Sequence, residues 1–126
     1  MSVKYTVSER GNPLQPQQPK KWYANAKSAG NTTLRTLGKE IAARSTVSPA
    51  DTQAVLVALT EVLVEHLADG KIVRLGDFGA FQVSISSTGA DTEAKFNASL
   101  IKGGKVIFRP GIDLKEMLNN LKYEKV

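Results

Sequence analysis

The sequence predicts a small α+β domain that pairs with a second copy of itself and carries an N-terminal extension. Three observations lead to this prediction: two consecutive helical segments, alternating apolar residues typical of an antiparallel sheet, and a helix too apolar for one small domain to cover. A chain of 126 residues suits one domain plus appendages. We expect the extension at residues 1–31 and the domain at residues 32–126.

The extension is predicted to combine a strand with a loop. Val3, Tyr5 and Val7 alternate with polar residues, so they share one side of a strand at residues 3–8. The prolines and glutamines that follow oppose regular structure. Residues 9–31 are therefore predicted to form a tethered loop, which docks through Trp22 and Tyr23.

Two helices are predicted next, the first at residues 33–44, where leucine and isoleucine recur at helical spacing. The second, residues 49–68, has Ser48 as its N-cap, proline at its first position and Gly70 beyond its end. Branched apolar residues cover well over half of its circumference, so it needs burial on more than one side. Because one short helix and one small sheet cannot supply that cover, we predict an obligate dimer.

The remainder is predicted to form a sheet and a final helix. Residues 72–75 and 81–85 are typical of an antiparallel hairpin that turns at Gly76-Asp77. Residues 87–104 are polar, and strand character resumes at residues 105–109. A last helix at residues 113–123 is predicted to point four apolar side chains inward: Leu114, Met117, Leu118 and Leu121.

Two motifs resemble signatures of the bacterial histone-like HU/IHF family of DNA-binding proteins. They are Gly76-Asp-Phe-Gly-Ala-Phe-Gln-Val83 and Phe108-Arg-Pro-Gly111, the latter followed by Leu114-Lys115. The resemblance spans residues 33–121, and with its extension the chain is similar to the longer, HU-related histone-like branch. It implies an intertwined dimer with a helical base, an antiparallel sheet that forms a saddle, and β-arms that wrap the minor groove and bend DNA.

The chain departs from that family in its arm. Residues 84–107 contain no Arg-Asn-Pro tip and no arginine, so DNA bending stays an open question. Arg10-Gly-Asn-Pro13 in the extension has a composition close to that tip, which makes Pro13 a candidate wedge between base pairs. The alternative is an ordinary β-turn that Asn12-Pro13 begins.

The charge balance favours a polyanionic partner. The formal net charge is +5 and the isoelectric point is about 9.6. Residues 1–31 contribute +4 of this charge and the remainder only +1. Arg109 is the first candidate for a phosphate contact, because alternation turns it away from a buried Phe108 and the resemblance implies that it faces the DNA. The other candidate DNA-binding residues are Lys102, Lys105, Lys115, Lys95, Arg10, Lys20 and Lys21.

Other function classes find little support. The sequence has no cysteine, no phosphate-binding glycine loop and no metal-ligand spacing, so we expect no catalytic residue, cofactor, metal or small-molecule substrate. The single histidine, His66, fits a packing or interface role, and Glu61 with Glu65 forms a solvated stripe. Since no apolar run could cross a bilayer or act as a secretory signal, we expect a cytoplasmic protein.

The sequence thus predicts a nucleoid-associated, histone-like homodimer that binds and condenses double-stranded DNA without strong sequence preference. The alternative is a dimer of the same fold whose arm and extension serve protein contacts, with weak or no DNA binding. Salt dependence distinguishes them, because phosphate contacts weaken steeply as salt rises.

Overall fold

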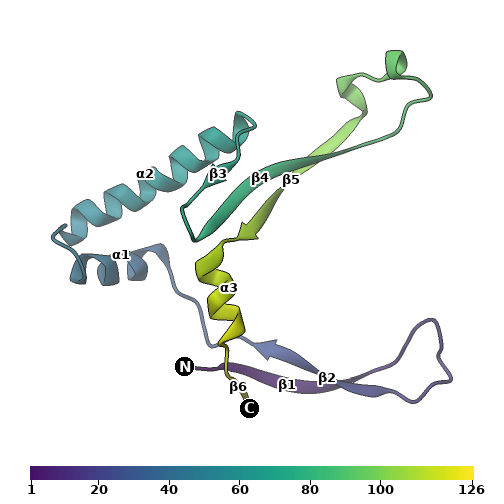
Figure 1. Cartoon of the computed structure of the whole chain (residues 1–126), viewed down its shortest axis with the longest axis horizontal. Helices are drawn as coiled ribbons and strands as arrows, with labels where there is room; N and C mark the ends of the chain where they lie inside the picture. The colour runs from purple at the N-terminus through teal and green to yellow at the C-terminus, as the bar shows by residue number, and fades with distance from the viewer. The chain divides into compact units, whose positions relative to one another are not determined.

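The computed structural model describes residues 1–126 and has the predicted α+β composition, with three α-helices and two three-stranded sheets. The chain forms two compact units. The first contains residues 1–33 and 117–126, and the second contains residues 34–116. Both units can be followed in Figure 1.

The second unit begins with the two predicted helices, α1 (Leu34–Ala43) and α2 (Pro49–Ala68). The N-cap of α2 is confirmed, because Ser48 Oγ accepts a hydrogen bond from the Asp51 amide at 3.2 Å. The two helices are joined by Gln53, whose Nε2 donates to the Arg35 carbonyl at 2.9 Å. Gly38 is buried against the Gln53 side chain, whose amide end would have to move to admit a Cβ atom.

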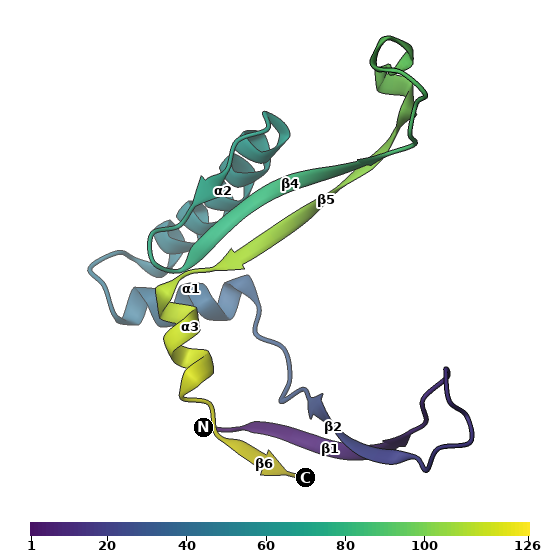
Figure 2. The same cartoon turned by 45° about the vertical axis from the view of Figure 1, so that its right-hand side comes forward.

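The sheet of the second unit has the order β3-β4-β5, with both pairs antiparallel. Its strands are β3 (Val73–Arg74), β4 (Gly79–Ser87) and β5 (Ile101–Pro110). Figures 1 and 2 show β4 and β5 continuing side by side beyond β3 as a long ribbon. β5 begins four residues earlier than expected, because the glycines that suggested a loop pair with Ile85 and Ser86 of β4.

The ribbon ends in a structured tip. It contains two short 3-10 helices, Glu93–Lys95 and Ala98–Leu100. Thr92 and Asn97 cap them through their side-chain oxygens. The Thr88 amide donates to the Leu100 carbonyl at 2.8 Å and closes the base of the tip.

The two sequence motifs meet at the end of β5 that leads into α3 (Ile112–Asn119). The Gly111 amide donates to the Phe78 carbonyl at 2.8 Å. A Cβ atom on Gly79 would lie 2.6 Å from the Arg109 carbonyl oxygen, and the φ angle of Gly79 is +158°. Glycine is therefore required at this crossing by both space and conformation.

The last helix is shorter than predicted. It ends at Asn119, and residues Tyr123–Lys125 form strand β6 instead of helix. The cause lies at the other end of the chain: β6 pairs in parallel with β1 (Val3–Arg10), and the Val3 amide donates to the Lys122 carbonyl at 2.8 Å. The helical pattern of residues 113–123 could not reveal this distant partner.

The first unit corrects the predicted loop at residues 9–31. It contains a second strand, β2 (Lys21–Lys27), which pairs antiparallel with β1 from Lys4↔Lys27 to Arg10↔Lys21. The prediction of a strand at residues 3–8 is confirmed. The alternation of Trp22, Ala24 and Ala26 with Lys21, Asn25 and Lys27 could have identified β2, whose pairing with β1 spans the intervening loop.

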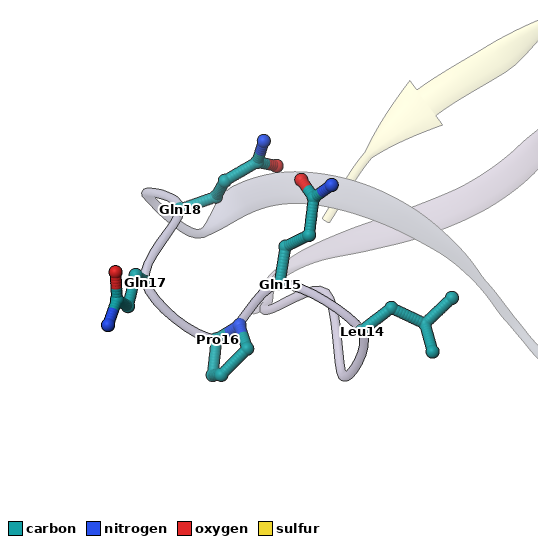
Figure 3. A pocket seen from close by; sticks show the side chains of 5 residues that line it. All are labelled: Leu14, Gln15, Pro16, Gln17 and Gln18. Atoms are coloured by element: carbon teal, nitrogen blue, oxygen red, sulfur yellow. The ribbon is translucent and has the colours of Figure 1, made fainter.

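The loop between β1 and β2 contains two successive turns. The Gln15 amide donates to the Asn12 carbonyl, and the Gln18 amide to the Gln15 carbonyl, both at 3.1 Å. The Leu14 amide also donates to Asn12 Oδ1 at 3.0 Å. Figure 3 shows the side chains of the loop pointing outward. The same residues, 14–18, line an open hollow of about 520 Å³. The Asn-Pro turn considered from the sequence is thus present.

The single chain has no apolar core. Its buried residues are Gly38, Thr52 and Gly79, and no hydrophobic side chain is buried. Met117 and Leu118, which were predicted to point inward, are half exposed at 49% and 51%, and Phe108 is 37% exposed rather than buried. Within one chain no element covers these side chains. No helix of the structure is both long and apolar enough to cross a membrane.

Candidate nucleic-acid interface

The ribbon of β4 and β5 has two chemically different faces. Directly opposite residues of an antiparallel pair point to the same side, and neighbours along a strand point to opposite sides. One face contains the pairs Phe81↔Phe108 and Val83↔Val106. The other contains Ala80↔Arg109, Gln82↔Ile107 and Ser84↔Lys105. We call the second the polar ribbon face.

Aromatic side chains of the apolar face hold the ribbon in place. The Phe108 ring lies 4.7 Å from that of Phe81 and 5.7 Å from that of Phe78, measured between ring centroids. Both ring pairs are tilted, and their centroid separations are typical of aromatic pairs in contact. The prediction that Arg109 points away from Phe108 is consistent with this register.

Two of the predicted DNA-binding residues lie together on the polar ribbon face. Lys105 and Arg109 are four residues apart on β5 and therefore about 13 Å apart. β4 and β5 contain no acidic residue, and neither cation forms an ion pair within the chain. The acids of the segment between the two strands, Asp91 and Glu93, lie in the tip.

Arg74 belongs to the same face, although the sequence did not single it out. It lies opposite Ala80 on β3, and Ala80 lies opposite Arg109 on β5. The two arginines thus flank one alanine, about 10 Å apart at their Cα atoms. Both arginines line a depression of about 160 Å³ together with Ala80, three glycines and a proline: Gly76, Gly79, Gly111 and Pro110. Alternation could have identified Arg74 from the sequence, because this residue lies between the apolar residues Val73 and Leu75.

The other lysines are more scattered. Lys102 is the extra residue at an irregularity in the ribbon, where Ser86 pairs with Gly103 and Ser87 with Ile101. Lys95 lies in the tip, and Lys115 lies in the first half of α3. The structure therefore brings Lys105 and Arg109 into one row with Arg74, and leaves Lys95 and Lys115 outside it.

The candidates of the extension lie in the first unit. Arg10 and Lys21 are opposite each other at the loop end of the hairpin. Lys20 and Pro13 lie in the loop itself and are exposed. The structure thus pairs two of the three basic candidates, and it places Pro13 in the first of the two turns.

The acidic residues and the histidine weighed from the sequence lie in the C-terminal part of α2. Glu61, Glu65 and His66 are exposed. No three histidine, aspartate or glutamate residues lie close enough to hold a metal ion.

Comparison with known proteins identifies related sequences and folds. Residues 1–125 match the family model described as HU-HIG, an HU domain fused to a wHTH, Ig or glycine-rich motif. A crystal structure from Bacteroides vulgatus, provisionally described as a bacterial DNA-binding protein, is similar in fold with a TM-score of 0.67 and 13% identity. The match covers 99% of this chain and 48% of that one, so the chain spans about half the length of this structural relative. No curated protein sequence matches the chain.

Proposed function

Because the chain belongs to the HU-HIG family, in which an HU domain is fused to a further motif, we propose that it binds duplex DNA as a homodimer and with little preference for base sequence. Such a protein acts where the chromosome lies, so the proposal locates it in the cytoplasm, at the nucleoid. Compaction of DNA, rather than a chemical reaction, is the proposed outcome of binding.

One observation carries the proposal: Arg74 and Arg109 flank Ala80 on a sheet face that lacks acidic residues. Two guanidinium groups without an internal carboxylate partner repel each other, and an anion between them relieves that repulsion. Arginine is suited to a phosphate because its planar fork donates two parallel hydrogen bonds. Lys105 extends the row along β5, with Lys102, Lys95 and Lys115 as further proposed contacts.

The homodimer is supported by the surface of the single chain. Its accessible surface is 10586 Å². A folded monomer of 13.6 kDa exposes about 6,600 Å², and two separate units of these sizes roughly 7,800 Å². Part of this excess surface comes from apolar side chains on two flanks of α2. One flank contains Val55, Leu59 and Val62, and the other contains Val57 and Val64. A second copy of the chain, intertwined as in HU proteins, is the proposed cover for these flanks.

The extension provides additional charge and a candidate wedge. Arg10, Lys20 and Lys21 are the contacts proposed from charge, and Pro13 is exposed at the hairpin loop. Pro13 lies in the turn between Asn12 and Gln15, and its ring is exposed. Insertion of Pro13 between base pairs, with bending of the duplex, is part of the proposal.

The alternative use of the fold in protein contacts also has an observation in its favour. The ribbon tip contains one lysine against two acids, and Phe96 is 42% exposed there. A tip of this composition attracts phosphates poorly, and its exposed phenylalanine can contact an apolar surface of another protein. DNA titration decides between the two uses.

Titration at several salt concentrations is expected to give a steep loss of affinity as salt rises. A row of four to six phosphate contacts predicts a slope of about −4 to −5 in a plot of log affinity against log salt concentration. Fluorescence polarisation with labelled duplexes measures it. The affinities of unrelated duplexes, measured by competition, should differ by less than about tenfold, because contacts to phosphates carry no sequence information. Discrimination of a thousandfold or more would contradict non-specific binding, and no binding at low salt would favour protein contacts.

A further inference from the structure

The hairpin of β1 and β2 has one strongly basic face. Its pairing register places the cations in two rows, Lys4 opposite Lys27 and Arg10 opposite Lys21. The rows between them are uncharged and polar, Thr6 opposite Asn25 and Ser8 opposite Tyr23. We call these eight residues the basic hairpin face. A count of charges along the sequence could not identify this face, because Lys4 and Lys27 are far apart in sequence and become neighbours only through the pairing of β1 and β2.

The opposite face of the same hairpin is apolar. It contains the pairs Tyr5↔Ala26 and Val7↔Ala24, and it borders a hollow of about 490 Å³ lined with Tyr123. The only acid of the two strands, Glu9, lies opposite Trp22 on this face. The hairpin is thus two-sided, and its positive charge is confined to one side.

A neighbouring acid makes one end of the basic face more positive than the other. Glu124 of β6 lies beside Lys4, and its carboxylate accepts a hydrogen bond from Ser2 Oγ at 3.0 Å. No acidic residue pairs with Arg10 or Lys21. The row of Arg10 and Lys21, next to the loop, therefore has the stronger positive potential.

Arg10 is held along this face by side-chain hydrogen bonds. Its Nη2 donates to Asn25 Oδ1, and Asn25 Nδ2 donates to Ser8 Oγ at 2.7 Å. Asn25 and Ser8 are half-buried, which makes them a firm support. An arginine held in this way loses less side-chain freedom when it binds an anion. Asn25 is accordingly a positioning residue for Arg10.

The spacing of the rows suits an extended polyanion. Six residues of strand separate Lys4 from Arg10, a distance of about 20 Å. Measured along the axis of B-DNA, this distance corresponds to about six phosphates of one strand. The uncharged rows between, with Tyr23 48% exposed, offer hydrogen-bond donors and an aromatic surface to the same backbone.

We propose that the basic hairpin face is a second contact surface for the phosphate backbone of duplex DNA, in addition to the row of Arg74 and Arg109. The inference rests on the DNA binding proposed above. It adds Lys4 and Lys27 to the contacts, and it leaves Lys20, which lies in the loop, with a smaller effect.

The test uses the full chain, because deletion of residues 1–31 would remove the strand that pairs with β6. Neutralising one row in the double variants Arg10→Gln with Lys21→Gln, or Lys4→Gln with Lys27→Gln, should reduce the salt slope by up to about two units. Affinity for a random duplex at about 0.1 M salt should fall by roughly tenfold or more, with the larger loss in the Arg10 and Lys21 variant. The single change Asn25→Ala should weaken binding several-fold and leave the slope nearly unchanged.

The matched control is Lys122→Gln with Lys125→Gln. It removes the same charge from the same unit, but Lys125 pairs with Tyr5 on the other face and Lys122 precedes β6. Circular dichroism checks the fold, and the exchanges Lys4→Arg and Lys21→Arg should retain the slope. If both row variants behave like this control while Arg109→Gln weakens binding, the inference is wrong and the proposed function stands. If the intact chain does not bind DNA at low salt, both fail.

Discussion

Reversing the charge of Arg74 and Arg109 together, Arg74→Glu with Arg109→Glu, is expected to weaken DNA binding by at least about a hundredfold at 0.1 M salt. Loss of two phosphate contacts accounts for most of this effect, since each contributes about 0.9 to the salt slope. The two carboxylates then repel the same phosphate. Polarisation titrations at several salt concentrations measure both the affinity and the slope, which should become shallower by about two units.

The matched control is Lys39→Glu with Arg44→Glu. Both residues are exposed and lie in or just after α1, so the net charge changes equally while the polar ribbon face is untouched. A modest, purely long-range loss is expected for this control. If the control loses as much affinity as the Arg74 and Arg109 variant, binding depends on overall charge and the row of arginines is not a site. Arg74→Lys with Arg109→Lys should preserve most of the slope but lose the bidentate geometry.

Introducing a charge on an apolar flank of α2 is expected to destroy the dimer and, with it, the fold. Val62 is 45% exposed in the single chain, and it shares its flank with Val55 and Leu59. In the proposed homodimer, Val62→Asp buries an unpaired carboxylate. We expect the free energy of unfolding to fall by about 3 kcal/mol or more. Chemical denaturation at several protein concentrations measures it, because the stability of a dimer depends on concentration.

The control for this variant is Ala54→Asp on the same helix. Ala54 is exposed and lies on the side of Glu61 and Glu65, about 100° around the helix from the flank of Val55, Leu59 and Val62. It should leave the stability nearly unchanged. Light scattering of the unaltered protein should give twice the chain mass of 13.6 kDa. A well-folded monomer, or a Val62→Asp variant as stable as Ala54→Asp, would show that α2 does not need a second copy.

These two experiments test different parts of the proposed function. Val62→Asp tests the association of two chains, whereas the arginine variant tests what the assembled protein binds. A stable dimer without affinity for DNA would leave the fold prediction intact and assign the surface to protein contacts. A monomer that binds DNA would require another explanation for the exposed flanks of α2.

Local sequence signals predicted the helices and the sheet of the second unit because each signal acts within a few residues. Ser48 caps α2 through an amide only three positions away, and the proline that follows it cannot occupy a helix interior. Alternation along β4 and β5 identified their faces, and with them the orientation of Arg109 relative to Phe108. These features depend on residues that are close together in the sequence.

The site itself depended on pairing between distant segments. Lys105 and Arg109 could be proposed from one strand, but Arg74 joins them only because β3 and β5 both pair with β4. Lys4 and Lys27 likewise share a face through the register of β1 and β2. Register sets which side chains are neighbours, and a shift of one residue would move every one of them to the other face.

The sequence by itself determined the fold class, the helix boundaries near their caps and the excess of basic residues, since all three follow from composition and short-range geometry. Only the tertiary structure decided that Tyr123–Lys125 is a strand, that the extension is a hairpin, and that its cations lie on one side. The physical reason is that a strand lacks internal hydrogen bonds. Its partner may be more than a hundred residues away, as β1 is from β6, so no local pattern can specify the pair.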